Sequence, residues 1–149
     1  MDLRSEVLDL FAKYNHAFTT RDHLTLSTVF CFPFEIQLHN GAKHVFETHA
    51  EMLSSGNIFQ DACASVGITR VDRIVETLHI TNKDEALLIS KVFAYSDGGA
   101  VSASWRTSFF VRSIPNIGIR IAKIDATELG RAMERLGFPL QDARLVSVN

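Results

Sequence analysis

Apolar residues recur at intervals of three and four over residues 3–18, which is typical of one stripe along a helix with 3.6 residues per turn. The stripe comprises Leu3, Val7, Leu10, Phe11, Tyr14 and Phe18. Asp2 can cap this helix, and the polar run at 19–22 interrupts the stripe. A short second helix then follows, capped by Asp22 or Thr20. It carries Leu24, Leu26, Val29 and Phe30, and we expect Pro33 to end it.

Beyond Pro33 the apolar period changes to two, which predicts a half-buried strand over residues 34–39. Asn40-Gly41 is a strong hairpin signal, so residues 42–46 are expected to pair back on that strand. Thr48 and Glu51 then form a capping box for a helix from about 49 to 64. The pair Ser55-Gly56 weakens the middle of this helix and marks a site where it can break.

From Ile68 onward, stretches dense in β-branched and aromatic residues predict four further strands. They cover residues 68–80, 85–95, 100–112 and 117–124. The segments between them are short turn sequences, which favours an antiparallel meander. Asp125 is expected to cap a last helix over about 126–136, with Gly137 as its stop. The tail from Phe138 has no clear pattern.

The order of these elements predicts an α+β fold in which helices cover one face of a curled sheet. About six strongly twisted strands must curl, and a curled sheet capped by helices encloses a cavity. No repeat, low-complexity tract or linker divides the chain. We therefore expect a single domain over residues 1–149, with its core at about 3–125 and a C-terminal helix and tail at 126–149.

Composition narrows the function classes. The chain is 46% hydrophobic and 21% charged with a net charge of −2, so it lacks the basic surface that nucleic acid requires, and no nucleic-acid partner is expected. Its apolar runs are too short to span a bilayer, and no membrane partner is expected. The start of the chain does not read as a signal peptide, and Cys31 and Cys63 read as reduced core thiols. These features predict a cytoplasmic protein.

Two groups of segments carry a family resemblance. Residues 11–18 lead to Arg21-Asp22, and residues 108–112 are followed by Gly118-Ile119-Arg120-Ile121. These segments resemble the NTF2-like (SnoaL-like) superfamily over about residues 3–125, which includes steroid isomerases, SnoaL-type cyclases, scytalone dehydratase and limonene epoxide hydrolase. The resemblance implies the cystatin-like cone, a curved mixed or antiparallel sheet of about six strands wrapped around N-terminal helices. Such segments are signatures of architecture rather than of chemistry.

The resemblance also implies one catalytic candidate, Tyr14, which lies eight residues before Asp22. In steroid isomerases a tyrosine in this position donates a hydrogen bond to the developing enolate oxygen, and a dry cavity strengthens such a bond. The alternative is a core tyrosine whose hydroxyl meets a carbonyl or water. The isomerases' general base is not matched, since Phe32 precedes Pro33 and Leu38 takes the base's position. Their second oxyanion donor falls on Thr107.

The predicted strand over 85–95 offers Lys91 and Phe93 as ligand-binding residues, because they share a face with Leu87, Ile89 and Tyr95. If that face is concave, Lys91 could orient a carboxylate or act as a base with a depressed pKa. The opposite face is apolar too, so the sequence leaves open which side holds the cavity. A lysine that snorkels from the sheet edge is the alternative.

In the strand over 100–112, Trp105 and Thr107 lie on an apolar face and are expected to shape the pocket together with Phe18 and Phe34. The opposite serine-arginine face is either solvated or a subunit contact, and a homodimer is expected from the resemblance. The six histidines show no metal-ligand spacing, so no metal site is expected. No nucleotide or cofactor fingerprint occurs, so no cofactor is expected.

Two functions fit these features. In the first, the cone cavity binds a small, largely apolar or carboxylate-bearing molecule, with proton transfer of the isomerase, dehydratase or cyclase kind. The base would come from Asp72, Glu76 or His79, each of which also suits the solvent side of its strand. In the second, the protein is a non-catalytic homodimeric module whose cavity is filled by its own side chains. The eleven phenylalanines suit either, because they can line a pocket or plug it.

Overall fold

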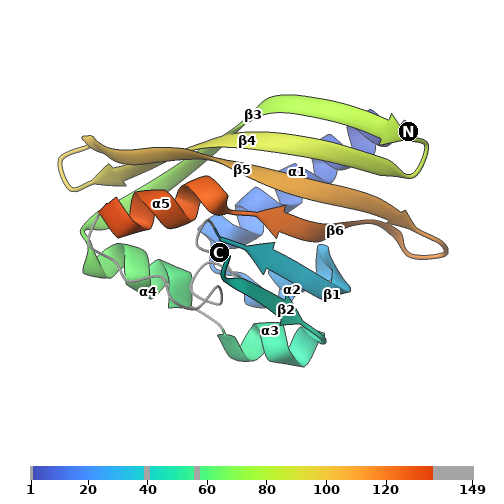
Figure 1. The fold of residues 1–149 in the computed structure, drawn as a ribbon, viewed down its shortest axis with the longest axis horizontal. Coiled ribbons are helices and arrows are strands. Elements are labelled where there is room, and N and C mark those ends of the chain that lie inside the picture. The colour runs from blue at the N-terminus through green and yellow to red at the C-terminus, as the bar shows by residue number, and fades with distance from the viewer. Residues whose placement is uncertain (1, 39–40, 56–57, 136–149) are drawn as a thin grey trace.

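The computed structural model describes residues 2–38, 41–55 and 58–135. Along this part of the chain, two helices precede two strands, two more helices precede four strands, and one helix follows (Figure 1). The elements are α1 (Leu3–Thr19), α2 (His23–Thr28), β1 (Phe30–Gln37), β2 (Lys43–Phe46), α3 (His49–Ser55), α4 (Ile58–Ser65), β3 (Ile68–Asn82), β4 (Glu85–Ser96), β5 (Val101–Ile114), β6 (Gly118–Asp125) and α5 (Thr127–Arg135). None of the helices in the described ranges is long and apolar enough to cross a membrane.

The N-terminal helices begin at the predicted caps. The Asp2 carboxylate accepts a hydrogen bond from the Ser5 amide at 2.8 Å, and that of Asp22 accepts from the Thr25 amide at 3.1 Å. Each bond satisfies an amide that the first helical turn leaves without an internal partner. The two helices therefore start where short acidic side chains can accept these hydrogen bonds.

The expectation that α2 continues to Pro33 is wrong. The helix ends at Thr28, and β1 begins at Phe30 and runs through Pro33. Proline is tolerated because the register of β1 against β6 shifts between Phe30 and Glu35, so no ladder bond needs its missing amide hydrogen.

Over the range 49–64, where one helix is expected, the structure has α3 up to Ser55 and α4 from Ile58. Residues 56–57, where a break is expected, lie outside the described residues. The capping box forms at the start of α3, where the Thr48 hydroxyl oxygen accepts from the Glu51 amide at 3.1 Å. The Glu51 carboxylate reaches back and accepts from the Glu47 amide at 3.0 Å. Residues 39–40 of the predicted hairpin turn and the predicted stop at Gly137 lie outside the described residues.

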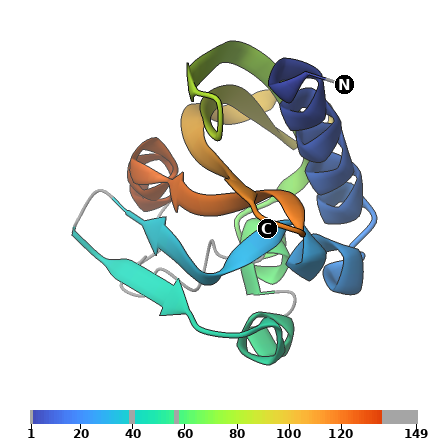
Figure 2. The same ribbon diagram turned by 90° about the vertical axis from the view of Figure 1, so that its right-hand side faces the viewer.

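The six strands form one mixed sheet in the order β2-β1-β6-β5-β4-β3. The β1–β6 pair is parallel and all other neighbours are antiparallel. The predicted meander from β3 to β6 is confirmed, and its strand ends lie within two residues of their predicted places. Figure 2 shows the sheet curling from β3 round to β2, with α1 lying across its open side.

Burial along β4 settles which face of the sheet is concave. Ala86, Leu88, Ser90, Val92 and Ala94 are buried, whereas the alternating set from Leu87 to Tyr95 is partly exposed. Across the β4–β5 ladder, Val92 lies opposite Trp105, Ser90 opposite Thr107 and Leu88 opposite Phe109. These residues therefore form the inner wall of the cone.

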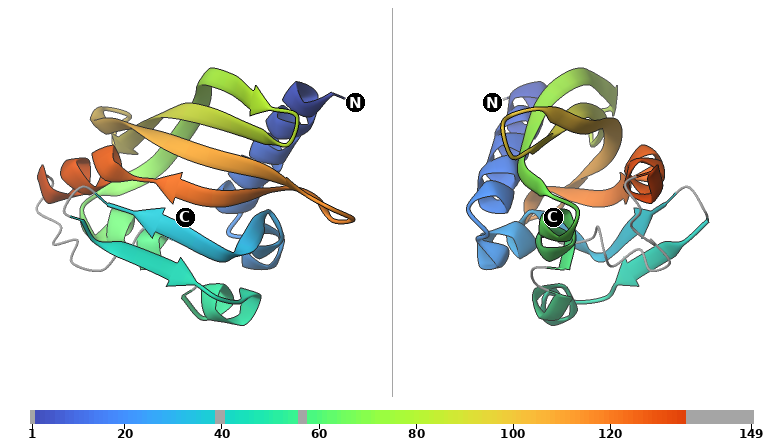
Figure 3. Two further views of the ribbon diagram at one scale, coloured as in Figure 1. Left: turned by 45° about the vertical axis from the view of Figure 1, so that its right-hand side comes forward. Right: turned by 90° about the vertical axis from the view of Figure 1, so that its left-hand side faces the viewer.

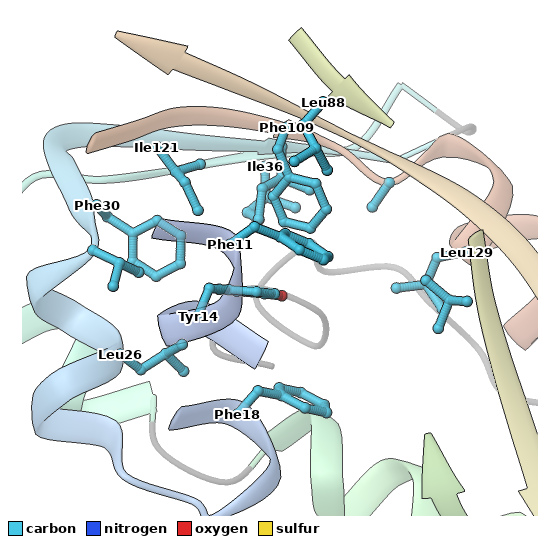
Figure 4. Packing of buried hydrophobic residues seen from close by; sticks show 14 of the residues in the cluster. Phe11, Tyr14, Phe18, Leu26, Phe30, Ile36, Leu88, Phe109, Ile121 and Leu129 are labelled. Carbon is cyan, nitrogen blue, oxygen red and sulfur yellow. The ribbon is translucent and has the colours of Figure 1, made fainter. Parts of the chain in front are cut away.

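The apolar stripe of α1 packs on this wall through aromatic contacts. The Tyr14 ring meets that of Phe109 edge to face at 5.1 Å between centroids, and Phe11 meets Phe109 at 5.4 Å. Figure 4 shows Tyr14 among Phe11, Phe30, Phe18 and Leu26, with its hydroxyl pointing away from Phe30 and Leu26. Side chains from α1, β1 and β5 therefore fill the inner part of the cone.

The last helix completes the wall where β6 stops. Because β6 ends at Asp125 opposite Ser108, the first half of β5 pairs with no strand of the described residues on that edge, and α5 lies along it instead (Figure 1). The Glu128 carboxylate of α5 accepts a hydrogen bond from the Arg106 amide of β5 at 3.2 Å. Leu129 and Ala132 of α5 are buried in the core. The helix thus covers an edge that would otherwise stay open.

The alternation along β5 predicts unequal effects for two adjacent phenylalanines. Phe109 is 1% exposed in the core, whereas Phe110 is 39% exposed on the outer face. We expect Phe109→Ala to lower the free energy of unfolding by about 3–5 kcal/mol, because it leaves a cavity in the aromatic cluster. Phe110→Ala is the matched control and should lower it by less than about 1.5 kcal/mol. Equal losses in urea denaturation would contradict the assignment of the inner face.

A second prediction concerns alkaline pH. Burial raises the pKa of the Cys63 thiol from its ordinary value of 9.0 to about 12, against a smaller opposing effect of the Arg73 charge. Between these values the unfolded chain loses a proton that the folded chain keeps. The free energy of unfolding should therefore fall as pH rises above 9, with a contribution from Cys63 of at most about 1.4 kcal/mol per pH unit.

Urea denaturation at about pH 8 and about pH 10.5 measures this contribution. Cys63→Ala should lose less stability over this interval than the unmodified protein. Cys31→Ala, which removes the partly exposed thiol, should lose as much as the unmodified protein. If both variants follow the unmodified protein, the buried thiol does not contribute as described.

Candidate functional site

A cavity of about 680 Å³ opens where the C-terminal end of α1, α4 and the first half of β3 meet. Helix α4 and the start of β3 lie together at one end of the molecule, and β3 runs from there toward the side where the N-terminus lies (Figure 3). The lining residues are Asn15, Phe18, Thr19, Arg21, Cys63, Ala64, Gly67–Arg73 and Asp97. The volume lies within the range of about 300–1,000 Å³ found for small-molecule sites.

The turn between α4 and β3 positions one wall of this cavity. After α4 ends, the Gly67 amide donates to the Ala64 carbonyl at 3.1 Å, and Gly67 takes a φ of +82°. Glycine suits this position because a side chain disfavours the left-handed conformation that closes a helix C-terminus. The chain is thereby turned into β3, and residues from Ile68 to Arg73 reach the cavity.

Arg73 is the cationic residue that this turn brings to the inner face of the sheet. In the β3–β4 register it lies opposite Val92, which in turn lies opposite Trp105 of β5. Its neighbour along the same face, Val71, lies opposite Ala94. Arg73 thus belongs to an apolar row, and the part of its surface that stays accessible lines the cavity.

The guanidinium of Arg73 is held by residues of α1. Its central carbon lies 3.7 Å from the centroid of the Phe18 ring, and its Nη1 donates to Asn15 Oδ1 at 3.4 Å. The Tyr14 ring centroid lies 5.6 Å from the same carbon. Residues 14, 15 and 18 lie on neighbouring positions of the last turns of α1. A single helix therefore fixes the orientation of the guanidinium plane.

Among the described residues, no carboxylate forms an ion pair with this guanidinium. Among the ion pairs of the described residues, Arg70 bonds Asp72 at 3.3 Å and Arg21 lies 4.0 Å from Asp61, but Arg73 takes part in none. Burial lowers the pKa of Arg73, which reflects the free-energy penalty of taking its charge out of water. An arginine nonetheless stays protonated at neutral pH. We refer to this cavity, with its unneutralised cation, as the Arg73 cleft.

Tyr14 lies behind Arg73 rather than on the wall of the cleft. Its side chain is 1% exposed, and burial raises its pKa above the ordinary value of 10.0, with Arg73 opposing the rise. The phenol therefore stays protonated at neutral pH and is joined to the cleft through the guanidinium. The catalytic role that the resemblance implies for Tyr14 stays a prediction.

The structure places the other predicted ligand residues in three groups. Phe18 lines the cleft. Phe34, Trp105 and Thr107 are buried on the inner side of the cone and do not belong to the cleft lining. Lys91 lies on the outer face opposite Ile74 and Arg106, and the period-two alternation places Phe93 on the same face. The sheet therefore separates these two residues from Tyr14 and from the cleft.

The three residues considered as general bases, Asp72, Glu76 and His79, lie in different surroundings. Asp72 lines the cleft but is paired with Arg70. Glu76 bonds Arg106 at 2.6 Å, and that hydrogen bond lowers the pKa of Glu76. His79 is exposed, opposite Leu87. Within the described part of the chain, no three histidine, cysteine or acidic side chains converge as a metal ion would require.

Sequence reasoning missed Arg73, although a signal for it was present. The alternation Val71, Arg73, Val75 sets one charge in an apolar row, the same pattern that drew attention to Lys91. The sequence could not tell which of these two rows faces inward. An oriented, unneutralised guanidinium in a partly apolar cleft can bind an anionic group or polarise an oxygen that gains negative charge.

The comparisons with known proteins support the fold. No protein-family model matches the sequence, and no curated protein matches it either. Among solved structures, a domain of unknown function with a cystatin-like fold from Nostoc punctiforme is similar at a TM-score of 0.65 and 16% identity, over 84% of this chain and 76% of that chain. A ketosteroid isomerase-like protein from Erwinia carotovora atroseptica is similar at a TM-score of 0.62 and 13% identity, over 81% of this chain and 92% of that one.

A third similar structure is an NTF-2 like protein of unknown function from Shewanella oneidensis, with a TM-score of 0.61 and 9% identity. That match covers 82% of this chain and 96% of the other. At such identities the likeness reaches the architecture and not the chemistry. The curled six-stranded sheet, the helices on its concave side and these neighbours agree, and the chain has the NTF2-like, cystatin-like cone fold.

Proposed function

We propose that this protein binds a small molecule in the Arg73 cleft. The observation that carries the proposal is the guanidinium of Arg73, which faces the cleft and has no carboxylate partner among the described residues. Removing a charge from water without a counter-charge is unfavourable for folding. A binding site gives a reason to keep such a group, since natural proteins accept a loss of stability where function requires it.

The rest of the cleft suits a ligand that is partly apolar. Phe18, Ala64, Ile68 and Val71 contribute carbon surface, and Asn15 and Arg73 contribute polar groups. Small-molecule sites are usually lined by apolar side chains together with a small number of polar groups. One structural neighbour is named as ketosteroid isomerase-like, which adds support for a pocket in this fold.

Binding at the cleft can be tested without knowledge of the natural ligand. Ala64 is exposed on the α4 wall, so Ala64→Trp should fill the cleft and leave the core unchanged. We expect the neutral fluorescent probe N-phenyl-1-naphthylamine to bind the unmodified protein and to bind Ala64→Trp at least about tenfold more weakly. Ala12→Trp, at an exposed position of α1, is the matched control and should bind as the unmodified protein does. Equal probe binding by all three proteins would exclude the cleft as the site.

A homodimeric module is the second candidate, and the outer face of the sheet favours it. Ile74 on β3 is 54% exposed and Phe110 on β5 is 39% exposed. The Glu76–Arg106 pair lies between these strands, so apolar and paired charged groups alternate on this face. A two-fold contact buries the same patch on both copies, and the exposed outer face of the sheet offers such a patch. The aromatic filling of the inner cone also fits a protein whose cavity is largely occupied.

If the protein is a homodimer, one substitution on the outer face should halve the molar mass that it has in solution. Ile74→Glu places a charge on each copy at the proposed contact and should convert a dimer to a monomer in size-exclusion chromatography with light scattering. Leu24→Glu is the control, since Leu24 is 69% exposed on α2, away from the sheet. A protein that is already monomeric at about 100 μM would rule this candidate out, because obligate homodimers persist well below that concentration.

A further inference from the structure

We infer that the ligand of the Arg73 cleft is a carboxylate carrying one negative charge on an apolar body. This inference rests on the proposed small-molecule binding and specifies its chemical class. It follows from three features of the cleft: the orientation of the guanidinium, the signs of the surrounding charges and the apolar walls.

The orientation of Arg73 favours a planar anion. A guanidinium offers five N–H groups in a rigid fork that matches the two oxygens of a carboxylate. Phe18 covers one face of the group at 3.7 Å, and Asn15 Oδ1 accepts a hydrogen bond at its edge. Arg73 lines the cleft, and its hydrogen bond to Asn15 uses one of its five N–H groups. Because α1 has already fixed the side chain, little rotamer entropy remains to be lost on binding.

The surrounding charges favour a single negative charge over two. The charged residues that line the cleft are Arg21, Arg70 and Arg73 against Asp72 and Asp97, a net of one positive charge. Arg70 is paired with Asp72, and Arg21 lies 4.0 Å from Asp61. Helices α1 and α4 both end there, at Thr19 and Ser65. Helix C-termini carry partial negative charge, which repels anions. A phosphate monoester would bring close to two charges into this setting against one free guanidinium. A carboxylate brings one, which Arg73 neutralises.

The remaining walls indicate what the carboxylate is attached to. Ala64, Ile68 and Val71 present carbon surface in the same cleft as the charged group, and the cavity of about 680 Å³ has room for a bicyclic ring system. Burial of such a body supplies affinity, and the guanidinium orients it.

A matched pair of probes tests the inference by isothermal titration calorimetry. The probes are 2-naphthoic acid, ionised at neutral pH, and 2-naphthamide, which has nearly the same shape and no charge. We expect the unmodified protein to bind the acid at least about tenfold more tightly than the amide, because hydrogen bonds to charged groups are stronger than neutral ones.

Three variants assign this preference to Arg73. Asn15→Asp keeps the shape of the side chain and places a carboxylate beside Nη1, so the preference for the acid should fall below about threefold. Arg73→Gln removes the cation and should have the same effect. Arg106→Gln, which removes an arginine on the outer face, is the control and should keep the full preference. Binding of the neutral N-phenyl-1-naphthylamine by each variant shows that its cleft is intact.

The outcomes separate the two proposals. If the neutral probe does not bind the cleft, small-molecule binding itself fails, and the carboxylate inference fails with it. If the neutral probe binds but the acid and the amide bind equally, only the carboxylate inference is overturned. A preference for the acid that survives in both Asn15→Asp and Arg73→Gln also overturns it, because the anion is then bound by another group.

Discussion

The structure depends on covering the concave face of a long, curled sheet. Strands β3, β4 and β5 are 15, 12 and 14 residues long, and a sheet of that length twists too strongly to stay flat. Helix α1 supplies the cover through a single aromatic stripe, in which Phe11 and Tyr14 pack edge to face on Phe109. Without this contact the inner wall of the cone would face water, and neither the sheet curl nor the position of α1 would be fixed.

The same contact decides where a cavity can exist. Aromatic rings occupy the cone from Phe34 to Tyr14, and the cavity of about 680 Å³ lies beyond them, at the last turn of α1. Arg73 lies at that boundary. Phe18, which ends the aromatic stripe, also forms the surface on which the guanidinium rests. The packing that holds the fold together therefore orients the cation, and the proposed site is a consequence of how the core ends.

Much of this architecture could be predicted, because it is encoded in local patterns. Caps at Asp2 and Asp22, the period-two strands and the turn sequences between β3 and β6 are short-range signals, and the structure confirms them. The expectation that Pro33 ends a helix is wrong, because a register shift in β1 accommodates this proline within a strand. The candidate site could not be predicted in this way, because the pairing register of distant strands decides which side chains face the cavity. Both faces of β4 are apolar, so Lys91 and Arg73 looked alike in sequence, and only the pairing of Arg73 with Val92 shows which one enters the cone.

The central claim is that the Arg73 guanidinium is open to a ligand from the cleft. The most direct measurement is the ¹H–¹⁵N NMR signal of the Arg73 Nε–Hε group, assigned by its loss in Arg73→Gln, during a titration with 2-naphthoate. The account predicts a saturable shift of this signal with the acid and a much smaller one with 2-naphthamide. A signal that stays unchanged while backbone amides of Ile68 and Val71 shift would show a ligand in the cleft that does not bind Arg73, and would contradict the account.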